Sequence, residues 1–513
     1  VVTLVLVIGS MSACNKSFDS LQADPNRATS VPANLILNNV LLNFTNGGFN
    51  TKQRANQYYL CNYDYYGNNE YNWTGYSFGN YNTLKNIAQM EAEATKSVAS
   101  PNPYTAIGKF LKAYFLYDLT MNLGDIPVSD ALKGLTNVTP KYDTQKQVFQ
   151  QILTYLEQAN TEMGTLKTTN YVLASDFYYG NDLSKWQKAV NAFKLRVLIQ
   201  LSNKEADADL AIKTKFAETV SNPTKYPVFA SDADNLTFVY NNQFNKYSTN
   251  PDNFGFDATR YNMSSTYLGN LASLKDPRTF FVAEPASALV ASGKLPNSYD
   301  AFAGAGAGED LATMSKNAGD GKYSFINRKR YYQTYTAEST TQVGYQELCF
   351  NMAEAAHRGW ITGQSAETWY QNGIKASQAF YGVKEGANTV TFQKPSGTLA
   401  ESVTYAVDYK YADYYAQATV KYAGSGTTGL NQILLQKYLS LYQNSGAEGY
   451  YNWRRTGVPT FHIGPGTGNS QRVALRYQYP STERAVNKAN VEAAIASQYG
   501  GADDINAKMW IIK

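Results

Sequence analysis

The chain has 513 residues, a formal net charge of +4 and only 17% charged residues. This charge is small for the length and no run of Lys and Arg is present, which argues against a nucleic-acid partner. The length accommodates two or three average domains or one large helical fold. Aromatic residues are abundant, with 42 Tyr, 23 Phe and 6 Trp against 2 His. Tyrosine suits wet recognition surfaces, although we expect most of these rings to lie in the core and at its rim.

The beginning of the chain indicates export and lipid attachment. Residues 1–8 are almost purely apolar, and small residues lead from there to Cys14. A run this short cannot span a bilayer as a mature helix, and it is typical of the hydrophobic part of a signal peptide. The small residues before Cys14 resemble a bacterial lipobox, which predicts a signal-peptide remnant at 1–13, a lipid on Cys14 and a flexible tether at 14–31. The alternative is a secretory signal followed by an incidental cysteine.

Helical patterns begin after the tether. Pro32 suits the first helical position, and an amphipathic pattern continues to Phe44. Residues 58–81 are rich in Tyr, Asn and Gly and show no sustained period, so we expect mainly loop there after a short helix. A further helix is predicted over residues 81–96.

Residues 107–127 predict a central support helix. Lys109 and Lys112 share one narrow stripe, and nearly every other direction carries a bulky apolar side chain, so this helix has to lie inside a domain. Gly124 and Pro127 end it. Asp118 points away from the lysines, into the core, where a carboxylate needs a cationic or amide partner.

The middle of the chain alternates helices and loops. Amphipathic helices are predicted at 141–163 and 185–201, and a more polar one at 204–221. We expect a loop-rich insertion at about 223–341. Within it, residues 282–321 are rich in Ala and Gly, including the alternating run 303–308, and predict an exposed elaboration outside the core.

The last third of the chain contains the clearest helix pair. Residues 345–360 and 365–382 place alanines where two helices would cross, as tetratricopeptide-type hairpins do, although a generic helical hairpin fits the period equally well. Further helices are predicted at the ranges 409–422, 430–443, 448–455 and 481–497. The fold class is therefore mainly α: a tetratricopeptide-like superhelix of helical hairpins with long irregular loops and few short strands, forming one domain from 32 to 513.

The chain offers little sign of catalysis, metals or cofactors. Cys61 and Cys349 either pair in an oxidising compartment or lie unpaired and buried. Residues 232–235 carry oxygen ligands but lack the glycine and the terminal glutamate of a calcium loop. His357 and His462 have no nucleophile ordered beside them, so we predict no catalytic residue, no metal and no cofactor.

Several motifs, taken in order, resemble the SusD/RagB family. They lie at residues 24–26, 110–127, 180–186, 276–278, 353–360, 452–459 and 476–480. The resemblance implies a surface lipoprotein of the outer membrane that hands glycans, or in some branches peptides, to a SusC-like TonB-dependent transporter. In that family these motifs build the superhelix and its interface with the transporter, and they do not bind ligand. Arg454 and Arg455, inside one of them, are expected to hold carboxylates or the carbonyl groups at helix ends.

The candidate ligand surface lies in the aromatic segment 58–81. A sugar ring presents apolar C–H faces, which stack on aromatic rings, and hydroxyls, which bond to amides and charged groups. The predicted binding residues are Tyr66, Tyr71, Asn72, Trp73 and Tyr76. The alternative is that this segment packs on the helices or against the transporter, because interfaces also enrich Tyr. A second, weaker cluster is predicted at Tyr331 and Tyr332, beside Arg328 and Arg330.

The predicted function is therefore capture of a glycan at the cell surface and its delivery to the transporter. Three alternatives remain at this stage: a peptide ligand on the same architecture, a hydrolase on the same scaffold, and a helical adaptor without a small ligand.

Overall fold

The computed structural model describes residues 30–395 and 397–513. Cys14, the signal-peptide remnant and nearly all of the tether lie outside the described residues. Among the helices that the structure describes, none is both long and apolar enough to cross a membrane.

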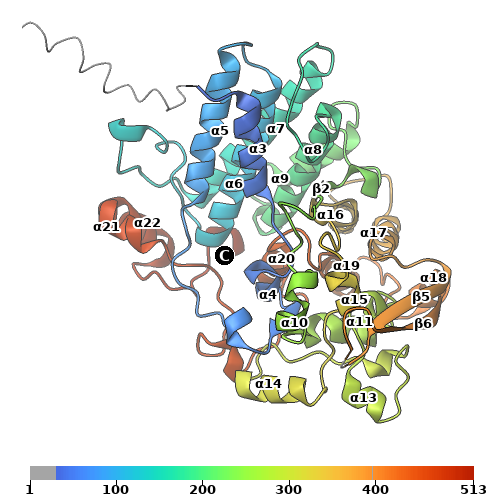
Figure 1. The fold of residues 1–513 in the computed structure, drawn as a ribbon. Coiled ribbons are helices and arrows are strands. Elements are labelled where there is room, and N and C mark those ends of the chain that lie inside the picture. Colours follow the sequence, from blue (N-terminus) through green and yellow to red (C-terminus); the bar gives the residue numbers. More distant parts are fainter. Residues whose placement is uncertain (1–29, 396) are drawn as a thin grey trace, which may run out of the picture.

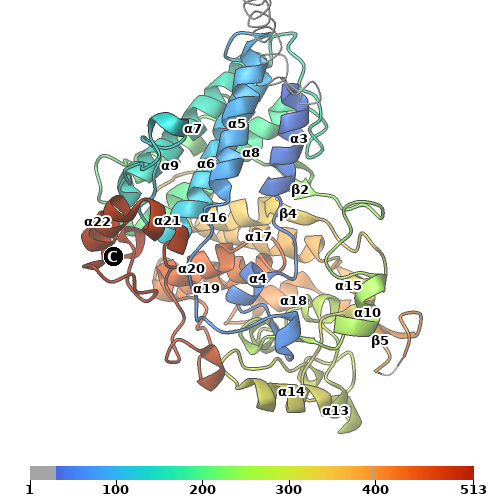
Figure 2. The same cartoon turned by 60° about the vertical axis from the view of Figure 1, so that its left-hand side comes forward.

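Six helices form the upper part of the molecule in Figures 1 and 2. They are α3 (Ala33–Phe44), α5 (Asn80–Thr95), α6 (Pro103–Leu123), α7 (Gln145–Leu166), α8 (Leu183–Gln200) and α9 (Ile212–Ser221). From α5 to α9, each helix packs against the next in the chain, and α3 packs against α5. This succession of neighbours is the arrangement of a helical-hairpin superhelix.

Helix α6 is the predicted support helix. Asn102 begins it, because its side chain accepts from the Thr105 backbone amide while the Thr105 hydroxyl accepts from the Asn102 amide. Gly124 ends it with a φ of 92°. The Asp118 carboxylate turns into the molecule and meets Lys52 Nζ at 2.8 Å and Asn80 Nδ2 at 3.0 Å. The expected cationic and amide partners are both present.

The centre of the molecule is built from later helices (Figure 2). These are α16 (Tyr345–His357), α17 (Ala366–Phe380), α19 (Thr427–Ser440) and α20 (Glu448–Thr456). Helix α16 packs on α17, on α19 and back on α8, so it connects the two halves of the scaffold. Gly373 lets α17 approach α16 closely, since a Cβ there would lie 2.8 Å from the Phe350 ring. The predicted mainly α fold is confirmed.

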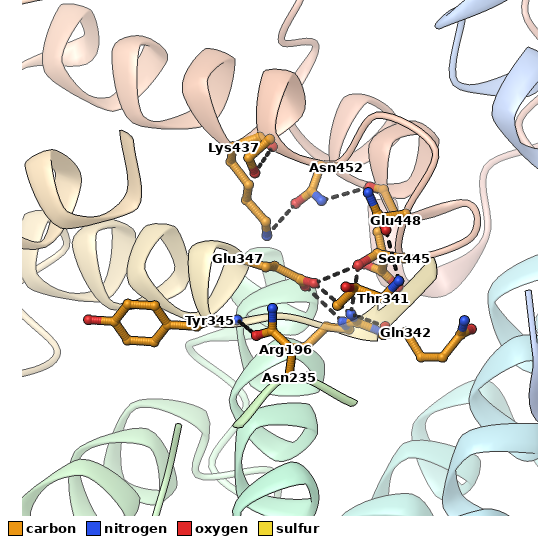
Figure 3. A network of polar contacts seen from close by, with 12 residues as sticks. Arg196, Asn235, Thr341, Gln342, Tyr345, Glu347, Lys437, Ser445, Glu448 and Asn452 are labelled. Atoms are coloured by element: carbon orange, nitrogen blue, oxygen red, sulfur yellow. Dashed lines mark hydrogen bonds and ion pairs between the residues drawn. The ribbon is translucent and has the colours of Figure 1, made fainter. Parts of the chain in front are cut away.

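A buried network of charged and amide groups joins these helices (Figure 3). Arg196 of α8 donates from Nε to Glu347 Oε1 of α16 at 2.7 Å and from Nη2 to the Gln342 carbonyl at 2.7 Å. Lys437 of α19 donates to Asn452 Oδ1 of α20 at 2.9 Å. Burial lowers the pKa of Lys437 to about 8, against the opposing effect of nearby glutamates. Because a buried charge needs a partner, these contacts fix the relative positions of the helices.

Of the two adjacent arginines of α20, Arg455 holds a carboxylate as the sequence predicts, whereas Arg454 binds a loop carbonyl and not one at a helix end. Arg455 Nη2 donates to Glu354 Oε2 of α16 at 2.8 Å, in a pair that is fully buried. Arg454 Nη1 donates to the Leu475 carbonyl at 2.8 Å. One guanidinium therefore holds a carboxylate and the other a main-chain carbonyl.

Strands are few and occur in three antiparallel pairs. β1 (Tyr59–Cys61) pairs with β3 (Tyr261–Met263), and β2 (Leu236–Phe238) pairs with β4 (Thr340–Val343). β5 (Gly386–Gln393) and β6 (Ser402–Tyr409) form a hairpin at the lower right of Figure 1. The sequence analysis did not predict this hairpin. The predicted helix 409–422 is wrong over most of its length, because β6 runs to Tyr409 and only α18 (Tyr411–Ala416) is helical after it.

Shorter helices complete the described chain. They are α4 (Thr51–Ala55), α10 (Phe254–Asp257), α11 (Asn270–Ser273), α12 (Thr279–Val282), α13 (Ser287–Ala291), α14 (Leu311–Gly319), α15 (Arg328–Tyr332), α21 (Ser481–Val486) and α22 (Lys488–Tyr499). The single helix predicted at 481–497 is divided in two at Asn487, whose φ and ψ of −130° and 38° leave the helical region.

The expectation that residues 282–321 are an exposed elaboration is wrong for residues 303–308. Ala305 and Ala307 are buried. A Cβ on Gly304 would lie 2.4 Å from the Ser264 backbone, and one on Gly308 would lie 2.1 Å from the Gly464 backbone nitrogen. The small residues are there because other backbone segments pass directly against them.

Candidate ligand-binding site

A cavity of about 530 Å³ lies between the β5–β6 hairpin, helices α13 and α14, and the segments at 259–260 and 323–328. We call it the hairpin pocket. The lining residues used below are Asn62, Arg260, Tyr323, Phe325, Arg328, Phe392, Gln393, Lys394 and Tyr405. Its volume is typical of a site for a small molecule or a few sugar rings. Figure 1 shows the hairpin at the right, α13 at the lower right and α14 at the bottom, all below the upper helices.

The hairpin supplies the aromatic wall of this pocket. Phe392 pairs with Val403 across the strands, and Tyr405 pairs with Val390. The Phe392 and Tyr405 rings lie 5.7 Å apart with an interplanar angle of 34°. Phe392 is buried, whereas Tyr405 is half-buried and therefore accessible to a ligand from the cavity.

An ion pair forms another part of the lining. Arg328, on α15, donates from Nε and from Nη2 to Glu284 Oε2 at 2.9 and 2.7 Å. The other carboxylate oxygen, Glu284 Oε1, accepts from the backbone amides of Arg328 at 2.9 Å and Gln393 at 3.3 Å. Glu284 thereby ties α15 to the hairpin, and its charge is balanced within the lining.

The pairing of β1 with β3 brings an N-terminal segment to the same pocket. Immediately after β1, the Asn62 amide donates to the Arg260 carbonyl at 3.0 Å. Asn62 Nδ2 donates to the Thr259 carbonyl at 2.9 Å. The aromatic segment therefore reaches the pocket through Asn62.

Tyr66 lies in a tyrosine cluster that borders the pocket. Its ring meets Tyr65 edge-on at 5.1 Å and Tyr63 at 6.0 Å, and Tyr65 is 80% exposed. Arg260, which lines the pocket, lies over the Tyr63 ring. Tyr66 does not itself line the hairpin pocket, and its ring is linked to the lining residue Arg260 through Tyr63.

Tyr71 does not present its ring to a ligand, and that part of the prediction is wrong for this structure. Its side chain is only 2% exposed, and its hydroxyl donates to the Ala55 carbonyl at 2.9 Å. Asn72 is exposed, and its Oδ1 accepts from the Asn469 backbone amide, so this side chain ties its own segment to the one at Asn469. The packing alternative therefore describes Tyr71.

Trp73 and Tyr76 lie in a different place from the hairpin pocket. The Trp73 ring stacks on Tyr477 at 4.2 Å with an interplanar angle of 7°. The Tyr76 hydroxyl donates to Asp118 Oδ2 at 2.5 Å, and Tyr76 lines a more open hollow of about 570 Å³ together with residues 478–482. Both rings are half-buried, and Tyr76 lines this hollow whereas Trp73 does not, so the hollow at Tyr76 is the competing location for a ligand.

The weaker predicted cluster is only partly at a surface. Tyr331 and Tyr332 are fully buried, so their predicted contact with ligand is wrong. The Tyr332 hydroxyl donates to Asp257 Oδ1 at 2.6 Å in the core. Arg328, from the same cluster, does line the pocket. Phe392 and Tyr405 were not among the residues predicted from the sequence. The alternation of Thr389, Val390, Thr391 and Phe392 is typical of a half-buried strand and could have indicated this segment.

Reactive groups outside the pocket are held in structural roles. Cys61 and Cys349 are free and buried, as one of the two alternatives predicted. Burial raises the pKa of Cys61 to about 11 and that of Cys349 to about 12, so both thiols stay protonated at neutral pH. Asp234, in the calcium candidate, is paired with Lys188 at 2.8 Å. Within 30–395 and 397–513, no three His, Cys, Asp or Glu side chains gather as a metal site.

Comparison with known proteins places the chain in a family. Residues 25–480 match the SusD-like family described as starch-binding and associating with the outer membrane. The chain belongs to this family, as the motifs in its sequence predict. No curated protein sequence matches it.

Solved structures show the same fold. A SusD homologue from Bacteroides fragilis has 29% sequence identity and a TM-score of 0.81, over 94% of this chain and 100% of that one. A second homologue from the same species has 29% identity and a TM-score of 0.78, with the same coverage. A chitin-binding SusD homologue from Flavobacterium johnsoniae, at 19% identity, covers 94% of this chain and 98% of its own, with a TM-score of 0.69. At that identity the likeness concerns the fold alone.

Proposed function

We propose that this protein is a lipid-anchored protein of the outer-membrane surface that binds glycan in the hairpin pocket and delivers it, chemically unchanged, to a SusC-like TonB-dependent transporter. Membership of a family described as starch-binding and associating with the outer membrane supports the general role. The lipobox-like sequence before Cys14 supports the anchor. The observation that carries the ligand assignment is the pocket itself, which combines accessible aromatic rings with polar groups.

The pocket chemistry suits a carbohydrate. Tyr405 and Phe325 are half-buried aromatic rings in the lining, and they offer apolar faces to the C–H faces of a sugar. Asn62, Gln393 and Arg260 supply amide and guanidinium groups close to those rings. Pockets that bind small ligands combine such apolar walls with a few placed polar groups.

A peptide ligand is the alternative within the same role. Peptides bind largely through main-chain hydrogen bonds, and an exposed strand edge or a groove is the usual means. The hairpin pocket is instead a cavity with aromatic walls, which favours a compact ring. A hydrolase is the alternative outside this role, and Ser265 Oγ lies 2.9 Å from His462 Nδ1. In the described part of the chain no carboxylate is hydrogen-bonded to this histidine, whereas a catalytic pair is normally oriented by a third group.

Calorimetric titration with a panel of oligosaccharides, including starch and chitin fragments, tests the ligand assignment. We expect Tyr405→Ala to weaken binding by roughly fivefold or more, because a lost ring contact is worth about 1 kcal/mol. Tyr76→Ala is the matched variant in the competing hollow, and we expect it to leave affinity unchanged. The reverse result would move the site to the hollow at Tyr76, and binding of peptides alone would replace glycan as the ligand.

Separate measurements test the other parts of the proposal. Cys14→Ala should release the protein from the membrane fraction, and purification from the native membrane should bring a TonB-dependent transporter with it. Turnover of any oligosaccharide that Ser265→Ala abolishes would overturn the assignment as a binding protein. A transporter that co-purifies without any soluble ligand shifting the Tm would instead support an adaptor.

A further inference from the structure

Arg260 is unusual among the arginines of the chain. Of those in the described residues, it alone has no side-chain hydrogen bond, while the others bind carboxylates, carbonyls, hydroxyls or amides. Its Nε is buried without a partner. A buried N–H group without an acceptor is costly, so its persistence at the wall of a cavity calls for an explanation.

The position of Arg260 is fixed although its charge is unpaired. Its backbone amide donates to the Asp257 carbonyl at 2.8 Å, and its carbonyl accepts from the Asn62 amide at 3.0 Å. The guanidinium lies over the Tyr63 ring, with Cζ 5.4 Å from the ring centroid. The backbone and the tyrosine therefore hold the cation at the pocket before any ligand arrives.

The nearby carboxylates are already engaged. Asp257 accepts from the Tyr332 hydroxyl at 2.6 Å and from the Tyr261 hydroxyl at 3.3 Å. Glu284, the one carboxylate among the lining residues, is bound by Arg328. With Arg260, Arg328 and Lys394 in the lining, the pocket carries an excess of positive charge.

Two residues that line this pocket carry buried amide oxygens without partners. Asn62 is 2% exposed and Gln393 is 4% exposed, and Oδ1 of the first and Oε1 of the second accept no hydrogen bond. Their amide nitrogens do have partners: Asn62 Nδ2 donates to the Thr259 carbonyl at 2.9 Å, and Gln393 Nε2 donates to the Glu401 carbonyl at 2.7 Å. The free oxygens are acceptors that suit hydroxyl donors.

We propose that the hairpin pocket selects an anionic sugar, whose carboxylate or sulfate binds the Arg260 guanidinium and whose hydroxyls donate to Asn62 and Gln393. The fork of a guanidinium fits two oxygens of one anionic group. An acidic sugar offers that group and several hydroxyls on one compact ring, so it satisfies all three unpartnered groups together. A neutral sugar leaves the cation without a counter-charge. This inference rests on the proposed function and names the ligand class for its site.

Matched ligands make the test specific. Uronic-acid oligosaccharides, such as oligogalacturonides and hyaluronan fragments, are titrated beside carboxyl-reduced forms of the same chains, and sulfated oligosaccharides beside desulfated ones. We expect at least one charged form to bind tenfold or more tightly than its neutral counterpart. A preference in the uronic-acid pair identifies the anion as a carboxylate, and a preference in the sulfated pair identifies it as a sulfate.

Arg260→Gln should remove that preference by weakening the charged form at least tenfold more than its neutral counterpart, and Arg260→Lys should keep part of it. Because the Arg260 side chain forms no hydrogen bond or ion pair and contacts only the face of the exposed Tyr63 ring, both variants should change the Tm little. Equal binding of charged and neutral forms, or a preference that survives Arg260→Gln, overturns the inference and leaves glycan binding in place. Binding of acidic peptides with no sugar bound, charged or neutral, overturns both the inference and the proposed function.

Discussion

The guanidinium carbon of Arg260 lies 5.4 Å from the centre of the Tyr63 ring, so an unpaired cation and an exposed aromatic face meet at one edge of the hairpin pocket. Tyr63 is 48% exposed and has neighbours only within its own tyrosine cluster and at Arg260 among the ring contacts that the structure describes. A ring in this position orients the cation and also extends the surface on which a sugar can stack.

We therefore expect Tyr63→Ala to weaken binding of the pocket ligand by roughly two- to fivefold, the equivalent of about 0.5–1 kcal/mol for a cation–π contact at an exposed site. Tyr63→Phe keeps the ring and should bind as the native protein does. Titration of both variants with the same ligand checks this. A loss in the phenylalanine variant as large as in the alanine variant would assign the effect to the hydroxyl and contradict the stacking argument.

The buried pair of Glu354 and Arg455 should dominate the stability of the central helices. Glu354→Gln leaves the Arg455 guanidinium buried beside a neutral amide, and we expect a loss of about 3–5 kcal/mol in the free energy of unfolding. Urea unfolding followed by circular dichroism measures it. Asp320→Asn, which breaks the exposed pair with Lys316, should cost about 1 kcal/mol or less. Similar losses in the two variants would show that the buried pair has no special role.

Asp125 should make stability depend on pH. Burial raises the pKa of Asp125 to about 7, although its Oδ1 accepts from the Gln145 amide at 2.7 Å. The unfolded chain releases this proton near pH 4, so between about pH 4 and pH 7 the folded state holds a proton that the unfolded state lacks. The contribution of Asp125 to the free energy of unfolding is therefore full below pH 4 and declines as the pH rises to 7.

Asp125→Asn removes this ionisation and keeps an oxygen for the Gln145 amide. We expect the variant to gain stability relative to the native protein as the pH rises from 4 to 8, by on the order of 1 kcal/mol or more. Thermal unfolding at both pH values gives the comparison. A difference between the two proteins that stays constant over this range would refute the assignment.

Two glycines of the segment 303–308 offer a matched test of its packing. Gly308→Ala would place a Cβ 2.1 Å from the Gly464 backbone nitrogen, and we expect a loss of about 1–3 kcal/mol because the backbone has to move. A Cβ on Gly306 meets only the Glu309 Cβ, at 3.9 Å. Gly306→Ala should thus be neutral, or stabilising by about 0.4–1 kcal/mol through the unfolded state. Chemical unfolding of the two variants compares them, and equal effects would contradict the close backbone approach.

The scaffold was predictable because its signals are local. The apolar sides of the support helix, its end at Gly124 and the partners required by Asp118 all follow from a few neighbouring residues. The guanidinium contacts of Arg454 and Arg455 follow from the general requirement that buried charges be paired. The structure agrees with each of these predictions.

The site was less predictable because it is assembled from distant segments. Asn62, Arg260, Arg328 and Tyr405 line one cavity, but no spacing in the sequence relates them. Composition drew attention to the tyrosine-rich segment, whose rings have different environments in the fold: Tyr71 is in the core and Tyr65 is on the surface. Periodicity reports which face of an element is buried, and it does not report which loops meet.

The β5–β6 hairpin forms one wall of the pocket from a single uninterrupted stretch of chain, and its two strands pair only with each other. The hairpin can therefore be replaced as one unit. Substituting one hairpin for another would alter Phe392, Gln393, Lys394 and Tyr405 in one event while the helices behind it keep their partners. A change in these pocket residues would then require the exchange of a short ribbon only, with the helical scaffold left unchanged.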